Sequence, residues 1–449
     1  LNEKLWELGI LAKTEHNEVA PAQHELAPIF TTTNIATDHN QLTMEIMQKV
    51  AKKHGMVCLL HEKPFAGVNG SGKHNNWSIS TDTGINLLEP GETPYDNAQF
   101  LLFLTAVIKA VDEYQDLLRI SASCAGNDHR LGANEAPPAV VSMFLGEELT
   151  EILQAIENDA DYSQKEKVQM KIGVHVIPKF PKDSTDRNRT SPFAFTGNKF
   201  EFRMLGSSMS IAEANITLNT AVAKELKEFA DELEGKENFT EALHELIKKT
   251  IIEHKRIIFN GNGYDDEWIK EAEKRGLLNL KSTPECLPYM LKDKNVALFR
   301  DFGVFTETEF KARYDIMLEN YIKTLKIEAL TMIDMVDKDV LPAISKFTKE
   351  LAKTISLKKQ VAGVDDTYEV ERLKTVSSLE AEIFKKVDEL SGIIATECID
   401  CHQKEAEFYH DTVFNKMQEL RAVVDRCETL TPSEEWPYPS YGDMLFGVR

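Results

Sequence analysis

The character of the chain changes at about Ile211, and this change constrains the fold more than any other feature of the sequence. Before Ile211, short β-rich runs alternate with helical stretches, and Gly, Pro and Asn separate them. After it, apolar residues recur every three or four positions over long segments, which is the pattern of amphipathic helices. Interruptions near 261–263, at Pro342 and around Gly363 are predicted to end individual helices. The sequence therefore predicts an α+β core followed by a helical extension.

Local patterns predict the individual elements. Residues 18–30 are predicted to be extended, because Pro21 and Pro28 exclude them from a helix interior. Hydrophobic spacing and capping residues predict the others. These are a helix that begins at Thr37 or Asp38, a buried strand over 56–60, an apolar helix over 96–119 and a helical packing seam over 370–390.

The charge balance excludes some classes of partner. Among 449 residues, 52 are Lys or Arg and 73 are Asp or Glu, which gives a formal net charge of −21. Such an acidic surface argues against nucleic acid and anionic membrane as partners, and it suits a protein that collects divalent cations. The most apolar stretch, 100–111, is about half the ~20 residues that cross a bilayer. Six cysteines imply no disulfide framework, so we expect a cytoplasmic setting.

A glycine-rich segment at 67–74, GVNGSGKH, nearly matches a P-loop, but His74 stands where a Ser or Thr would bind Mg²⁺. The segment HEKPF separates it from the preceding apolar run, and the following NNWSIS alternates like a strand instead of opening a helix. This context argues against a P-loop, and a P-loop NTPase is kept only as a further alternative. The loop still offers backbone amides to an anionic ligand, with Asn69 as a polar anchor. His74 is either a metal ligand or a structural histidine.

Two carboxylates, Glu18 and Glu25, lie in the extended segment with His16, Gln23 and His24 beside them. Positions seven apart on a straight strand point to opposite faces, but a bend at Pro21 can bring them together. A carboxylate pair then suits Mg²⁺ or Mn²⁺, which prefer several oxygen ligands. The alternative is two solvated glutamates.

The run KFEFR places three charged side chains, Lys199, Glu201 and Arg203, on one face of a predicted strand. On a site wall, Glu201 could hold a metal while the two cations neutralise phosphate or carboxylate, as phosphoryl transfer requires. On an ordinary surface the same residues form a polar face.

The motifs EVAPAQHE, KPFAGVNGSGKH, RLGANEAP, NRTSPF and KFEFR occur in a fixed order, and together they resemble glutamine synthetase, with features similar to type III. The resemblance covers essentially the whole chain. It implies an α+β catalytic domain over 1–320, in which helices flank an antiparallel sheet, and a helical C-terminal extension over 321–449.

The resemblance also implies roles for individual residues, position by position. The implied metal ligands are Glu18 and Glu25 for a first ion, and His74 and Glu201 for a second. The implied glutamate-binding residues are Asn69, Gly70, Arg130, Glu135 and Arg203. The implied ATP-binding residues are Phe30, Ser78, Arg189 and Lys199, and the implied catalytic residues are Glu135, which closes a flap, and Arg189, which stabilises the transferred phosphoryl group.

The activity implied is ATP-dependent ligation of glutamate and ammonia through γ-glutamyl phosphate, with Mg²⁺ or Mn²⁺, in a homo-oligomeric ring of six or twelve subunits. Some features depart from the family pattern. Ala194 replaces an arginine, the RLGANE flap is one residue short, and two further metal-ligand glutamates and an N-terminal β-domain are expected upstream of Glu18. We therefore expect activity of the full-length protein. The alternatives are a glutamate ligase for polyamines or other amines, and a non-catalytic assembly module.

Overall fold

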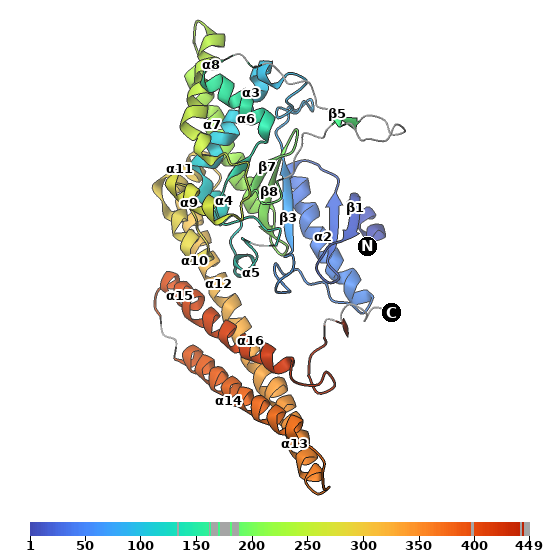
Figure 1. The fold of residues 1–449 in the computed structure, drawn as a ribbon. Coiled ribbons are helices and arrows are strands. Elements are labelled where there is room, and N and C mark those ends of the chain that lie inside the picture. Colours follow the sequence, from blue (N-terminus) through green and yellow to red (C-terminus); the bar gives the residue numbers. More distant parts are fainter. Residues whose placement is uncertain are drawn as a thin grey trace. The chain divides into compact units, whose positions relative to one another are not determined.

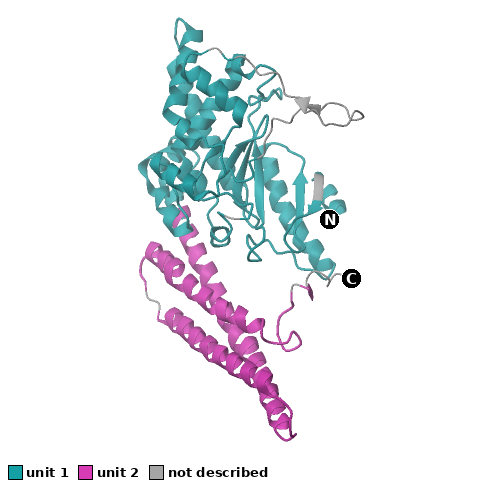
Figure 2. Ribbon diagram, in the orientation of Figure 1, with its two compact units in different colours: residues 1–312 teal, residues 313–449 magenta. Residues whose placement is uncertain are grey.

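The computed structural model describes residues 1–132, 134–160, 162, 169–170, 180–181, 188–396, 399–440 and 442–443. The chain divides into two compact units, residues 1–312 and 313–449 (Figure 2). Helix α12 (Glu307–Met335) contains the point of division and also residue 320, where the sequence predicts the boundary. The predicted sites all lie in unit 1.

The central sheet of unit 1 has the strand order β3-β8-β7-β4. Figure 1 labels β3, β8 and β7 of this sheet. Its strands are β3 (Gly72–Trp77), β8 (Phe200–Gly206), β7 (Phe193–Phe195) and β4 (Met143–Phe144). β8 pairs antiparallel with both β3 and β7, whereas β4 pairs with β7 in parallel. The α+β class is thus confirmed, but the sheet is mixed instead of purely antiparallel, because β4 and β7 are joined by a crossover instead of a hairpin.

Two smaller pairs of strands accompany the sheet. β1 (Ala12–Asn17) and β2 (His24–Pro28) form an antiparallel hairpin, and β5 (Gln169–Met170) pairs antiparallel with β6 (Phe180–Pro181). The extended character predicted over 18–30 is confirmed for β2, whereas residues 18–23 form the turn of the hairpin. Unit 1 also contains the helices α1 (Asn2–Trp6), α2 (Thr33–Lys53), α3 (Ala98–Glu113), α4 (Gln115–Ile120), α5 (Ala125–Asp128), α6 (Glu147–Glu157), α7 (Ala212–Leu233), α8 (Phe239–His254), α9 (Asp266–Lys274), α10 (Thr283–Cys286) and α11 (Asp293–Asp301).

The buried helix α3 forms the core beside the sheet, and α7 and α8 pack on it. The Asn97 side chain accepts a hydrogen bond from Phe100 N at 3.0 Å and so caps α3. The apolar helical character predicted over 96–119 is thus confirmed, but the segment is divided at Tyr114 into α3 and α4 instead of forming one helix. On β7 and β8, Phe193 stacks on Phe200 at a centroid distance of 4.6 Å. This aromatic packing fixes the strands that carry the charged face of KFEFR.

Two predictions about residues 33–60 were wrong. Helix α2 begins at Thr33 instead of at Thr37 or Asp38, because Thr32 is extended and its carbonyl already accepts from Ala36 N at 2.9 Å. Residues 56–60 form no strand, and Val57 is 82% exposed. An apolar run needs a partner strand to become part of a sheet, and none pairs with it in the described part of the chain.

Unit 2 is helical, with α13 (Leu341–Lys358), α14 (Thr367–Ala395), α15 (His402–Phe408) and α16 (Asn415–Glu428). The seam predicted over 370–390 is confirmed, because α14 buries one apolar stripe and packs on α13 and α16. Gly363 lies in the break between α13 and α14, with φ of +79°. The break predicted at Pro342 was wrong. A π-helical turn over Val336–Val340 joins α12 to α13, and it accommodates the missing N–H of proline.

Candidate active site

The first group of site residues is built on the β1–β2 hairpin. His16 is the cross-strand partner of Glu25, and the hairpin bends between Glu18 and Gln23, where Glu18 N donates to Gln23 O at 2.9 Å. His16 Nδ1 lies 3.4 Å from Glu18 Oε1, and His16 Nε2 lies 3.4 Å from Glu25 Oε2. One ligand atom from each of the three side chains lies within 4.8 Å of the others. The structure thus brings Glu18 and Glu25 together, as the predicted bend at Pro21 requires.

The chemistry of this hairpin group fits a divalent cation. The pKa of Glu25 is raised, mainly by a hydrogen bond with Glu18, then by burial and by the charge of Glu18, while His16 lowers it. Two carboxylates that compete in this way are stabilised by a positive ion between them. His16 was not among the predicted ligands. Its spacing of two residues from Glu18 on a strand is the signal that could have found it.

The second group lies where β3 pairs with β8. Asn76 is opposite Glu201, and the register shifts between Lys73 and Asn75, which is the position of His74. Side chains two apart on β3 share a face with their cross-strand partners, so His74 and Glu201 lie on the same side of the sheet. A histidine and a carboxylate on one face fit the second metal position implied by the sequence.

Arg203 lies on that face too. Its Nε and Nη2 both donate to Glu201 Oε2, at 3.2 and 2.9 Å, and its Nη1 donates to the carbonyl of Asn188. Both side chains are largely buried, so this charge-assisted pair fixes the orientation of each. The alternation predicted for KFEFR is confirmed in this part.

Glu135 joins two distant segments of the site. Its Oε2 accepts from Asn69 Nδ2 at 2.8 Å, and its Oε1 accepts from Arg189 Nη1 at 2.8 Å. Glu135 and Asn134 both have positive φ, of 67° and 53°. The charge of Glu135 also contributes to the raised pKa of Glu25, so the flap residue faces the hairpin group. Three residues predicted separately therefore meet in one contact network.

The glycine-rich loop is held from two sides. Gln23 Nε2 donates to Gly70 O and to Ser71 Oγ, each at 3.0 Å, which ties the loop to the hairpin. Residues 72–77 form β3 instead of a helix, and Lys73 Nζ donates to Ser207 O at 2.6 Å. Burial lowers the pKa of Lys73 to about 8. The P-loop alternative is therefore wrong, since a strand follows the loop and its lysine is largely buried.

Arg130 lies deep beneath the loop, at 4% exposure. Its Nη1 donates to Met204 O at 3.1 Å and to Asn127 Oδ1 at 3.2 Å, and its Nη2 donates to Arg203 O at 3.1 Å. Burial lowers its pKa to about 10. A Cβ on Gly72 would lie 2.0 Å from Nη2, so only glycine leaves room for the guanidinium. The role of Arg130 in holding the carboxylate of glutamate stays a prediction.

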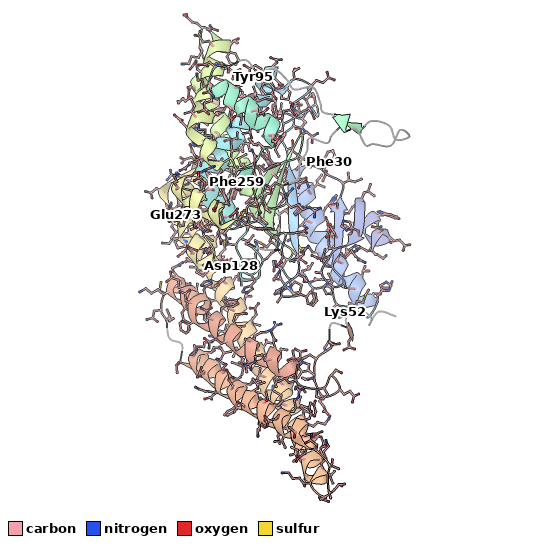
Figure 3. All side chains as sticks on the ribbon, in the orientation of Figure 1. Phe30, Lys52, Tyr95, Asp128, Phe259 and Glu273 are labelled. Carbon is pink, nitrogen blue, oxygen red and sulfur yellow. The ribbon has the colours of Figure 1, made fainter. Side chains whose placement is uncertain are left out.

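The residues predicted to lie near the nucleotide fall into two places. Ser78 Oγ donates to Asn86 Oδ1 at 2.6 Å and to Asn198 O at 3.2 Å, which places Ser78 beside the β7–β8 turn that carries Lys199. Phe30 lies between β2 and α2, and its ring, labelled in Figure 3, is 90% exposed. Ser78 therefore contacts the residue that precedes Lys199, whereas Phe30 lies in another segment of the chain.

Glu62 is a site residue that the sequence analysis missed. Glu62 is only 3% exposed, and its Oε1 accepts hydrogen bonds from Ser208 N at 3.0 Å and from Ser208 Oγ at 2.5 Å. Its backbone carbonyl accepts from Ser71 N at 2.7 Å. A Cβ on Gly126 or Gly206 would lie 2.2 or 2.4 Å from the Glu62 side chain. Glu62 therefore joins the glycine-rich loop to the end of β8.

Comparisons with known proteins identify the family of the chain. The family model "Glutamine synthetase, catalytic domain" matches residues 1–140, and the model "Glutamine synthetase C-terminal domain" matches residues 242–359. The chain belongs to the glutamine synthetase family. Among the described helices, none combines the length and apolarity needed to span a membrane.

Three relatives align with nearly all of the chain. It is 50% identical to a glutamine synthetase of Butyrivibrio fibrisolvens over 100% of this chain and 64% of that protein. It is 46% identical to the type-3 glutamine synthetase of Dictyostelium discoideum, over 99% of this chain and 62% of that protein. It is 42% identical to a glutamine synthetase of Bacteroides fragilis over 98% of this chain and 62% of that protein. The resemblance to type III is confirmed, and the chain spans less than two thirds of these relatives' length.

Proposed function

We propose that the full-length protein is a glutamate–ammonia ligase that uses ATP with Mg²⁺ or Mn²⁺. The observation that carries this proposal is the contact of Glu135 with Asn69 and Arg189, beside the Glu18–Glu25 pair. In this proposal the contact joins a group that would bind metal, a cation that would bind phosphate and a carboxylate that would close the site, as phosphoryl transfer to a carboxylate requires.

In the proposed reaction, a side-chain carboxylate oxygen of glutamate attacks the γ-phosphorus of ATP, and ADP leaves. Arg189 stabilises the charge of the transferred phosphoryl group, while Asn69 and Gly70 orient glutamate. Ammonia then attacks the carbonyl carbon of the acyl phosphate, and phosphate leaves with the electrons of the C–O bond. Glu135 closes the site against water.

The proposed metal ions would be held by Glu18 and Glu25 on the hairpin, and by His74 and Glu201 on the sheet. When bound, they would neutralise the phosphate charge that opposes attack by a carboxylate. We further propose that the nucleotide lies near Ser78, Lys199 and Phe30, and that the protein works in the cytoplasm as a hexameric or dodecameric ring.

The proposal is tested by phosphate release from ATP in the full-length gene product, with and without glutamate and ammonium. Release that requires both substrates is expected. Release with glutamate and a polyamine, but not with ammonium, would instead identify an amine ligase. No release, together with no nucleotide binding, would refute the enzymatic function and favour an assembly module.

A further inference from the structure

A loop at residues 260–264, NGNGY, approaches the site from a part of the chain that the sequence analysis treated only as a helix break. Its start is firmly anchored. Phe259, labelled in Figure 3, stacks on Trp268 with ring centroids 3.7 Å apart, and its N–H donates to Met143 O at 2.8 Å. Asn260 Oδ1 accepts from two backbone N–H groups just after β4, both at 3.1 Å. The loop is therefore attached to the sheet and to α9.

The backbone of the loop holds the side chains of the two residues that flank Arg189. Asn188 Nδ2 donates to Gly261 O at 2.6 Å, and Gly263 N donates to Thr190 Oγ1 at 2.7 Å. The second contact depends on glycine, because a Cβ on Gly263 would lie 2.9 Å from Thr190 O and 3.2 Å from its Oγ1. The two hydrogen bonds fix the residues immediately before and after Arg189.

Arg189 needs such support because little else holds it. Its side chain is 74% exposed, and it forms an ion pair with Glu135, whose side chain is 46% exposed. An exposed ion pair of this kind contributes about 0–1 kcal/mol, too little to hold a long side chain in one geometry. The position of the guanidinium is therefore decided by the backbone that carries it. The same backbone also accepts from Arg203 at the Asn188 carbonyl.

The far end of the loop reaches the flap. Tyr264 is 38% exposed, and its pKa is raised mainly by burial and further by the Glu135 carboxylate. A hydrogen bond from the Glu135 backbone and the charge of Arg130 act in the opposite direction. Tyr264 therefore lies against the left-handed segment that presents the Glu135 carboxylate to Arg189.

We propose that the 260–264 loop is a positioning element for the phosphoryl-transfer site: it fixes the backbone of residues 188–190, and so holds Arg189 opposite Glu135. This inference rests on the proposed function for its catalytic consequence, but not for the clamp itself. Gly263 and Tyr264 are positioning residues, because they act through Arg189 and Glu135 and not on substrate. The segment lies in the region that matches the C-terminal family model, outside the match to the catalytic model.

The test compares Gly263→Ala with Gly392→Ala in the full-length gene product. Gly392 lies in α14 with nothing within 4 Å of an added Cβ, so it controls for the substitution itself. Gly263→Ala is expected to lower kcat for glutamate-dependent phosphate release by about 100-fold, as misplacement of a catalytic group by about 1 Å does. The KM for glutamate should change less than about threefold, because uniform binding of the substrate is retained. An unchanged kcat would overturn the proposal.

A double-mutant cycle shows whether the effect passes through Arg189. When Arg189 is already replaced by lysine, adding Gly263→Ala should lower kcat by less than about threefold, because the group that it misplaces is already altered. A full, additive loss would overturn the positioning role. The conservative variant Tyr264→Phe removes only the hydroxyl that faces Glu135, and it should lower kcat without lowering the melting temperature.

Hydrogen exchange tests the clamp without any catalytic readout. The amides of residues 188–190 should exchange faster in Gly263→Ala than in the wild type or in Gly392→Ala, because Thr190 loses its partner. Equal exchange in all three proteins would overturn the clamp. A wild type without glutamate-dependent phosphate release would refute the proposed function, and the exchange measurement would still decide whether the loop fixes this segment.

Discussion

Replacing Arg189 by alanine should separate catalysis from stability. Arg189 forms an ion pair with Glu135 at 2.8 Å, and the two side chains are 74% and 46% exposed, respectively. Breaking such a pair should change the free energy of unfolding by about 1 kcal/mol or less. An arginine that stabilises a transferred phosphoryl group contributes far more, roughly 10³-fold or greater in kcat. Even a smaller loss of about 100-fold in kcat would correspond to about 2.7 kcal/mol of transition-state stabilisation.

Arg300→Ala is the matched control for this prediction. Arg300 Nε contacts Asp301 Oδ1 at 2.8 Å, with the two side chains 54% and 57% exposed, so it also forms an exposed ion pair, but away from the predicted site. Urea denaturation should give both variants nearly wild-type stability, whereas phosphate release should fall only in Arg189→Ala. Equal activity in the two variants would refute the assignment of Arg189. A stability loss above about 2 kcal/mol in Arg189→Ala alone would refute the claim that its ion pair is weak.

Three further predictions concern buried and metal-binding groups. Burial lowers the pKa of Lys73 to about 8. The free energy of unfolding should therefore rise as the pH increases from about 8 to 10.5, because in this range the unfolded chain binds more protons than the folded chain. The variant Lys73→Met should not show this rise when urea midpoints are measured against pH. Glu62→Gln should cost about 2–3 kcal/mol in urea denaturation, because charge-assisted hydrogen bonds from Ser208 are weakened in a buried site. Glu18→Gln or Glu25→Gln should weaken Mn²⁺ binding at least about tenfold, measured by electron paramagnetic resonance titration.

Each of these predictions has a control on the protein surface. Lys49→Met should leave the pH dependence unchanged, because Lys49 is exposed. Glu253→Gln should leave stability unchanged, and Glu3→Gln should leave Mn²⁺ affinity unchanged, since both glutamates are exposed. A pH slope that survives in Lys73→Met, or a Glu62→Gln variant as stable as its control, would contradict the burial argument. An Mn²⁺ affinity that is unchanged in both Glu18→Gln and Glu25→Gln would contradict the proposed metal position.

The hairpin residues could be predicted from the sequence because the signal there is local. Glu18 and Glu25 are seven residues apart with Pro21 between them, and a bend is sufficient to make them converge. The pairing of His16 with Glu25 depends on strand register, which the sequence leaves open until the turn is known. The metal-binding chemistry was therefore predictable, but its full set of neighbours was not.

Other features depend on contacts between distant segments. Glu62 looks like one polar residue in HEKPF, and its burial is created by glycines at 126 and 206 that approach it only in the folded chain. Glu135 adopts a left-handed conformation, which a sequence signals reliably only through glycine. The 260–264 loop reads as a helix break because its partners, at 188–190, are about seventy residues away. Local patterns cannot reveal such pairings.

The π-helical turn over Val336–Val340 affects how the helix tolerates insertions and deletions. A π turn contains one residue more than an α turn. Deleting one residue from it would therefore leave a regular helix whose apolar faces remain in phase, provided that Pro342 is also replaced, because its ring would clash with the preceding α-helical turn. The same deletion in the middle of α14 would rotate the rest of that helix by about 100° and remove its stripe from α13 and α16. The π-helical turn is therefore a position at which the long helix can lose one residue without a change in the phase of its apolar faces.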